Sequence, residues 1–207
     1  MKEAINFLLA GVGGQGTILA SDVLVSVGLA AGLQAKQAEV HGMSQRGGSV
    51  TSFVRWGEVV FSPLVGAGEV DVLLSFEKLE ALRTLNQLRS NAVVLINNQV
   101  IEPLTAISGD QKYPSDKVIK DAFAKVSSHV EFIGGEEIAR SLGNPRVANV
   151  VLLGALSALL ERDGVAGPEL TSETWLTVIT DRVPQKHIEL NQKAFQAGRD
   201  AIKKTGI

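Results

Sequence analysis

Apolar and polar positions along the chain form two alternating patterns, which together predict a layered α/β protein. Short apolar runs bounded by glycine, proline or polar clusters indicate buried strands, and longer stretches with apolar residues at helical spacing indicate helices. We expect strands at residues 5–10, 33–40, 50–56, 59–61, 70–76, 92–96 and 130–133. We expect helices after residue 16 and at residues 77–88, 116–126, 135–142, 146–162, 172–181 and 184–204. Such alternation is typical of a three-layer, Rossmann-like α/β domain with a mostly parallel sheet.

Two segments modify this simple pattern. Residues 50–56 and 59–61 flank Gly57 and Glu58, which predicts a hairpin and makes the sheet mixed. The helix at 146–162 is apolar nearly all round, so we expect it to be buried on most sides, partly against another chain.

The only linker-like stretch is 164–168, where glycine and proline cluster. We therefore expect an α/β domain over residues 1–164. Residues 165–207 should then form a C-terminal helical segment that packs on the same domain.

A glycine loop, GVGGQG, separates the first predicted strand from the first helix. Its members Gly11, Gly13, Gly14, Gln15 and Gly16 can bring backbone amides close to an anion, and the helix that follows offers free N–H groups and the positive end of its dipole. This arrangement favours a site for a phosphate or a phosphate-bearing cofactor. The alternative is a tight β–α turn that only packs.

A nicotinamide dinucleotide site would require an acidic residue at the end of the second strand, about 20 residues after the loop. Glu39 is the candidate, but it lies 28 residues after Gly11 and is followed by a loop that carries Arg46. A free-standing Rossmann-type nucleotide-binding enzyme therefore stays open as an alternative.

Composition excludes several classes of function. The formal net charge is −2, without the basic excess that nucleic-acid or anionic-membrane binding requires. The chain has no cysteine, so it can supply no thiolate to a metal or an iron–sulfur cluster and no disulfide. Neither His129 nor His187 has a second ligand at metal-binding spacing, and we predict no metal site.

We expect a cytoplasmic protein. Glu3 and the glycine loop interrupt what would be the apolar region of a signal peptide. The apolar run at 147–160 has 14 residues, which suits a core helix better than a membrane span.

A second loop, HGMSQRGGS at residues 41–49, holds an arginine between small residues. Arg46 can reach a phosphate or carboxylate with bidentate geometry, or it can tie the loop to a helix end or to Glu39. His41 is a candidate acid or base because histidine titrates near neutral pH, although a structural histidine is the simpler interpretation. We expect both loops to follow adjacent parallel strands and to face one crevice.

Three ordered motifs carry a resemblance to a known family: GVGGQG, HGMSQRGGSV and NPRVANVVLLGAL. The chain resembles the gamma-type subunit or domain of 2-oxoacid:ferredoxin oxidoreductases, most closely the branch that oxidises indolepyruvate. The resemblance covers about residues 5–160, and NQKAFQAG near the C-terminus is similar as well.

The resemblance implies an enzyme subunit that is inactive alone, beside a large companion that binds thiamine diphosphate and the iron–sulfur clusters. The complex would oxidatively decarboxylate an arylpyruvate to an acyl-CoA and reduce ferredoxin. CoA would be contacted by the glycine loop. From the apolar helix and the glycine-rich loops themselves, we expect the chain to self-associate when it is without its companion. A purely structural subunit without any small-molecule site is a further alternative.

Residue by residue, the resemblance implies that a partner- and substrate-facing loop is formed by Gly42, Arg46, Gly47 and Gly48. Asn149, a polar residue within the apolar helix, matches the third motif. Its simpler interpretation is a buried amide bonded to a neighbouring backbone group.

Overall fold

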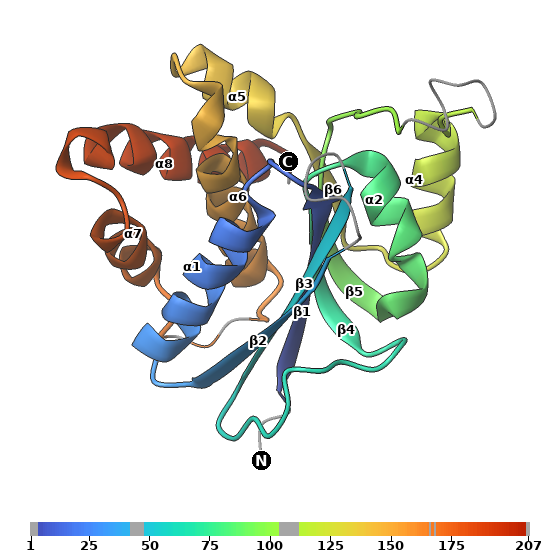
Figure 1. Ribbon diagram of the computed structural model, residues 1–207, viewed down its shortest axis with the longest axis horizontal. Helices are drawn as coiled ribbons and strands as arrows, with labels where there is room; N and C mark the ends of the chain where they lie inside the picture. Colours follow the sequence, from blue (N-terminus) through green and yellow to red (C-terminus); the bar gives the residue numbers. More distant parts are fainter. Residues whose placement is uncertain (1–3, 42–47, 104–111, 166, 168, 206–207) are drawn as a thin grey trace.

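A six-stranded mixed sheet lies at the centre of the protein, with helices on both faces (Figure 1). This computed structural model describes residues 4–41, 48–103, 112–165, 167 and 169–205. In sheet order the strands are β2 (Gln34–His41), β3 (Ser49–Gly57), β1 (Ile5–Val12), β4 (Val70–Ser75), β5 (Leu88–Asn97) and β6 (Val130–Ile133). The helices are α1 (Thr17–Ala30), α2 (Lys78–Arg83), α4 (Asp116–Ala124), α5 (Gly135–Ser141), α6 (Ala148–Arg162), α7 (Ser172–Asp181) and α8 (Ile188–Thr205). Short 3-10 turns are η1 (Leu85–Gln87), η2 (Pro145–Val147) and η3 (Gln185–His187).

Strand directions confirm the mixed sheet but correct the predicted hairpin. β1, β4, β5 and β6 run parallel, whereas β3 is antiparallel to both of its neighbours, β1 and β2. Residues 59–61 are not a strand, because both edges of β3 are already paired. Side chains bind this segment instead. Gln34 Oε1 accepts the N–H of Val60 at 2.9 Å, and Lys36 Nζ donates to the carbonyl of Phe61 at 3.2 Å.

Alternate residues of β1 belong to two separate cores. Phe7 and Leu9 are buried in a cluster with α1, α6, α7 and α8, whereas Leu8 and Ala10 are buried in a cluster with α2 and α4. Because side chains on a strand point alternately to opposite faces, helices cover both sides of the sheet. The predicted three-layer α/β architecture is confirmed.

Aromatic side chains connect the sheet to the last two helices. Phe7 and Trp56 have ring centroids 4.4 Å apart, Trp56 and Trp175 of α7 are 6.3 Å apart, and Trp175 and Phe195 of α8 are 6.4 Å apart. The Nε1 of Trp56 donates to the carbonyl of Leu24 at 3.0 Å, which satisfies its polar group in the core. The helices beyond residue 165 therefore share the core of the α/β layers.

Helix α6 is enclosed by this chain. Every residue from Asn149 to Leu160 is buried, and α8 packs along the helix. The expectation that α6 is covered partly by another chain is wrong, because α8 covers the side that the sheet and α1 leave open. This removes one of the two sequence-based reasons for self-association, the apolar helix, and leaves the glycine-rich loops. Among the described helices, none combines the length and apolarity needed to cross a bilayer.

Two helix boundaries depend on local hydrogen bonds. Helix α2 ends at Arg83, earlier than the predicted residue 88, and is followed by η1 and then by β5. At this end, Thr84 Oγ1 donates to the carbonyl of Ala81 at 2.8 Å. Before α6, Asn144 Oδ1 accepts the N–H of Arg146 at 3.0 Å, and Pro145 takes the first position of η2. Both residue types favour these positions, because asparagine is a good N-cap and proline suits the first position of a helical turn.

Candidate functional site

The glycine loop lies at the carboxyl edge of the sheet, between the end of β1 and the start of α1 (Figure 1). Positive φ falls on Gly14 (105°) and Gly16 (82°) and, among the described residues, not on Gly13. Gly16 is the N-cap of α1, and this end of the helix has no side-chain cap and no acidic residue in its first turn. The first turn of α1 thus supplies no acidic side chain of its own to its free amides or to the positive end of its dipole.

Both ends of the second loop share this edge. β2 ends at His41, β3 begins at Ser49, and the N–H of Gly13 donates to the carbonyl of Gly48 at 2.9 Å. The expectation that the loops follow adjacent strands is wrong, because β3 runs between β1 and β2.

The predicted residues Gly42, Arg46 and Gly47 lie outside the described part of the chain, as does the side chain of His41. Their roles therefore stay predictions.

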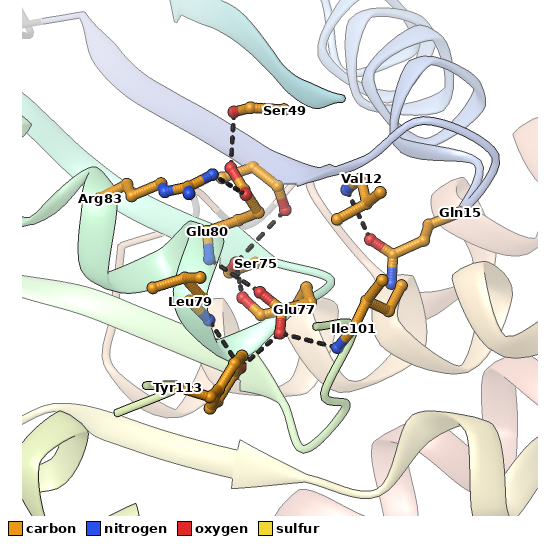
Figure 2. A network of polar contacts seen from close by, with 11 residues as sticks. Val12, Gln15, Ser49, Ser75, Glu77, Leu79, Glu80, Arg83, Ile101 and Tyr113 are labelled. Carbon is orange, nitrogen blue, oxygen red and sulfur yellow. Dashed lines mark hydrogen bonds and ion pairs between the residues drawn. The ribbon is translucent and has the colours of Figure 1, made fainter. Parts of the chain in front are cut away.

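Gln15 connects the glycine loop to the neighbouring parallel strand (Figure 2). Its Oε1 accepts the N–H of Val12 at 2.7 Å, and its Nε2 donates to the carbonyl of Phe76 at 3.0 Å and to Gln99 Oε1 at 2.9 Å. The side chain crosses from the end of β1 to the end of β4, which is where ligands gather in open α/β sheets. Its polar atoms are thus used within the protein.

Gly11 and Thr17 pack closely at the base of the loop. A Cβ on Gly11 would lie 2.7 Å from Thr17 Oγ1 and 2.9 Å from Gln15 Oε1, so packing alone requires glycine there. The hydroxyl of Thr17 is buried and has no hydrogen-bond partner among the residues that the structure describes. An unpaired buried hydroxyl is costly, and this one stands at the first position of α1.

Asn149 lies against the glycine loop from the start of α6. A Cβ on Gly16 would come within 3.1 Å of Asn149 Nδ2. The residue is 7% exposed, and its Oδ1 accepts the N–H of Val150 at 2.9 Å, in agreement with the simpler interpretation of a buried amide. Its Nδ2 has no partner among the described residues. The structure thus brings together two motifs that are far apart in the sequence.

Glu77, buried beneath the same edge, was not singled out from the sequence (Figure 2). It caps α2 by accepting the N–H of Glu80 at 2.9 Å, and it also accepts the N–H of Ile101 at 3.1 Å and the hydroxyl of Tyr113. Burial, followed by the hydrogen bond to Glu77, raises the pKa of Tyr113 well above its usual range, so the phenol stays a neutral donor.

Glu80 is a second buried carboxylate one turn later (Figure 2). It accepts from Ser49 Oγ at 2.5 Å and pairs with Arg83 at 2.6 Å. The two glutamates therefore hold the start of β3 and the chain near residue 101 against α2. The only sequence signal was the spacing Glu77-x-x-Glu80, which resembles a capping box but lacks its Ser or Thr.

The remaining candidates do not add a cofactor site. Glu39 lies on the edge strand β2, separated from β1 by β3, so the carboxylate that a ribose would need is not beside the glycine loop. Within the described residues, no three His, Asp or Glu side chains come together in a way that could hold a metal ion.

We predict that Gln15→Leu lowers the free energy of unfolding by about 1–3 kcal/mol, because it leaves the Val12 N–H unpaired and removes one of the two donors to the Phe76 carbonyl, the other being Asn97 Nδ2. Urea unfolding followed by circular dichroism measures the change. Gln192→Leu, at an exposed position of α8, is the matched control and should be near neutral. Equal unfolding midpoints for both variants would show that the Gln15 bonds contribute nothing.

Comparison with known proteins gives one consistent match. Residues 6–201 match the family model described as pyruvate ferredoxin/flavodoxin oxidoreductase. The chain is 40% identical over 204 residues to the indolepyruvate oxidoreductase subunit IorB of Thermococcus kodakarensis, covering 98% of each chain. It is 30% identical over 197 residues to the 2-oxoglutarate synthase subunit KorC of Methanothermobacter marburgensis, covering 94% of each. The fold is similar to the gamma subunit of a keto/oxoacid ferredoxin oxidoreductase from Geobacter sulfurreducens, with a TM-score of 0.69, 24% identity and coverage of 97% and 99%.

Proposed function

Because the chain belongs to the pyruvate ferredoxin/flavodoxin oxidoreductase family, we propose that it is the small, non-redox subunit of a 2-oxoacid:ferredoxin oxidoreductase acting on indolepyruvate or a related arylpyruvate. The observation that carries this proposal is the 40% identity to an indolepyruvate oxidoreductase subunit along nearly the whole of both chains. The complex would decarboxylate the 2-oxoacid oxidatively to an acyl-CoA and pass the electrons to ferredoxin.

The chemistry of the chain's residues supports a division of labour with a companion subunit. Iron–sulfur clusters are held mainly by cysteine thiolates, and this chain has no cysteine. We infer that the clusters lie in a larger companion, which also binds thiamine diphosphate and passes electrons to ferredoxin. We place this complex in the cytoplasm.

We propose that the phosphate-bearing part of CoA contacts the glycine loop. The start of α1 supports this, since it has no side-chain cap and no acidic residue. Gly14 is exposed, and an added Cβ there would meet nothing within 4 Å, so a ligand could approach the backbone. Gln15 would contribute by holding the loop in shape.

The second loop, with Gly42, Arg46, Gly47 and Gly48, would face the companion and the substrate pocket. Support comes from its two flanks, which lie at the same edge as the glycine loop, and from the bond between Gly13 and Gly48. Arg46 would pair with an anionic group of a substrate. His41 stays a weaker candidate for an acid or base.

Two variants assembled with the companion test these roles. Arg46→Ala should slow the step that uses its anion roughly ten- to a hundredfold, because a hydrogen bond to a charged group contributes about 1.5–3 kcal/mol. Gly14→Ala should raise the CoA concentration needed for half-maximal rate, because its Cβ blocks close approach of a phosphate. Rates are measured as a function of CoA and of 2-oxoacid separately.

Gly32→Ala is the matched control for Gly14→Ala. Both glycines have positive φ and open space around an added Cβ, but Gly32 follows the other end of α1. The two variants should lose similar stability, and only Gly14→Ala should alter CoA dependence. Unaltered CoA dependence in a folded Gly14→Ala complex would make the loop a structural turn, and unaltered kinetics for both substrates would assign Arg46 a structural role.

A further inference from the structure

We propose that a cavity behind the glycine loop binds a small carboxylic acid with an apolar body, a role separate from the proposed CoA contact. The cavity has a volume of about 250 Å³ and is bounded by α1, the start of α6, the end of α7 and the start of α8. Since a water molecule occupies about 30 Å³ in the liquid, this is the space of about eight waters. This size suits a compact organic acid.

Apolar side chains from three helices form the inner walls. Val23 of α1, Val150 and Leu153 of α6 and Ile179 of α7 line the cavity, and each is less than 9% exposed. Such walls favour an apolar ligand body, because burying apolar surface is the main favourable contribution to binding in a pocket of this kind.

Two buried amides bring unpaired polar groups to this cavity. Asn149 and Asn191 both line it and are 7% and 6% exposed. Asn191 Nδ2 donates to the carbonyl of His187 at 2.8 Å, which leaves its Oδ1 without a partner among the described residues. Asn149 Oδ1 accepts the N–H of Val150, and its Nδ2 has no partner within the described residues. Neither of these two atoms is completely buried, so each can form a hydrogen bond with a polar group of a ligand in the cavity.

Basic side chains at the rim of the cavity favour a negatively charged ligand. Arg146, Arg182 and His187 line the cavity, and none of its lining residues is acidic. Arg182 donates to Ser26 Oγ at 2.5 Å, whereas the guanidinium of Arg146 has no partner within the described ranges. Guanidinium groups bind carboxylates with two parallel hydrogen bonds. Apolar walls with a basic rim therefore point to a monocarboxylate.

The cavity and the glycine loop share one residue. Asn149 lines the cavity, and its Nδ2 also lies against Gly16. A ligand that pairs with this amide would contact the residue that supports the N-cap of α1. Occupancy of the cavity should consequently be visible in the backbone signals of Gly16.

Titration of the ¹⁵N-labelled full chain with phenylacetate tests the proposal without the companion subunit. We expect a Kd of about 1 mM or tighter, in keeping with the small size of the probe, and shifts centred on Asn149, Asn191 and Gly16. Phenylacetamide, its neutral counterpart, should bind at least tenfold more weakly. Equal binding of acid and amide, shifts elsewhere, or no binding of the acid would each overturn the proposal.

Single substitutions distinguish a loss of phenylacetate binding from a loss of folding. Arg146→Gln, at an exposed position, should weaken phenylacetate binding about tenfold, and Arg140→Gln on α5, outside this cavity, should leave it unchanged. Asn149→Asp adds a negative charge to the wall and should abolish binding of the acid; should this buried change prevent folding, the comparison of Arg146→Gln with Arg140→Gln still decides. Equal affinities for those two arginine variants would contradict the proposal.

Discussion

Gly198→Ala will destabilise the protein by about 3 kcal/mol, even though alanine is the better helix former. A Cβ on Gly198 of α8 would lie 1.9 Å from the carbonyl oxygen of Val151 and 2.8 Å from the backbone nitrogen of Ala155. Overpacking a core typically costs about 1–3 kcal/mol, and this contact is with backbone of α6, which cannot rotate away as a side chain can. The two helices would have to separate.

A second glycine makes the same contact from the other helix. A Cβ on Gly154 of α6 would lie 2.0 Å from the carbonyl oxygen of Phe195. Separation of α6 from α8 would also disturb Phe195, which packs on Trp175. We therefore expect Gly154→Ala to destabilise by a similar amount.

Thermal unfolding measures the change, and its sign is decisive. In an exposed helix, replacing glycine with alanine would stabilise by about 1 kcal/mol. For a chain of this size, a loss of 3 kcal/mol lowers Tm by about 6–12 °C. Gln192→Ala, exposed on α8, is the control and should leave Tm nearly unchanged. A Tm for Gly198→Ala at or above that of the unchanged protein would show that the helices do not meet at these glycines.

The second large effect concerns activity. The purified chain alone should show no arylpyruvate-dependent reduction of a viologen dye, because it has no cysteine to hold an electron-transferring cluster. Addition of the companion subunit should restore the reaction. The companion alone is the control, and its rate should be well below that of the complex. Turnover by the isolated chain would contradict its assignment as a non-redox subunit.

Much of the local structure could be predicted because it depends on neighbouring residues. The strand at the start of the chain, the glycine turn and α1 follow from apolar periodicity and from glycine's access to positive φ, now seen at Gly14 and Gly16. Asn144 caps η2 and Pro145 takes its first position, both in keeping with their residue types. Helix α7 begins and ends at the predicted residues, 172 and 181.

The sequence-based predictions were wrong where the structure of a segment depends on a distant part of the chain. Residues 59–61 have a strand-like composition, but β3 pairs with β1 on one edge and β2 on the other. Helix α6 is apolar enough to suggest another chain, but α8 covers it through close contact at Gly154 and Gly198. Neither outcome is encoded in a local pattern, since each depends on which distant segment arrives at the same place.

By itself, the sequence determined the α/β class, the glycine loop with its helix dipole, and the lack of any thiolate ligand, because these depend on residue type and short-range spacing. Only the tertiary structure decided that Gln15 is bonded across to β4, that Glu39 is separated from the loop by β3, and that Asn149 lies against Gly16. The physical reason is that hydrogen bonds and packing between distant segments depend on strand order and helix approach, and sequence periodicity does not specify either.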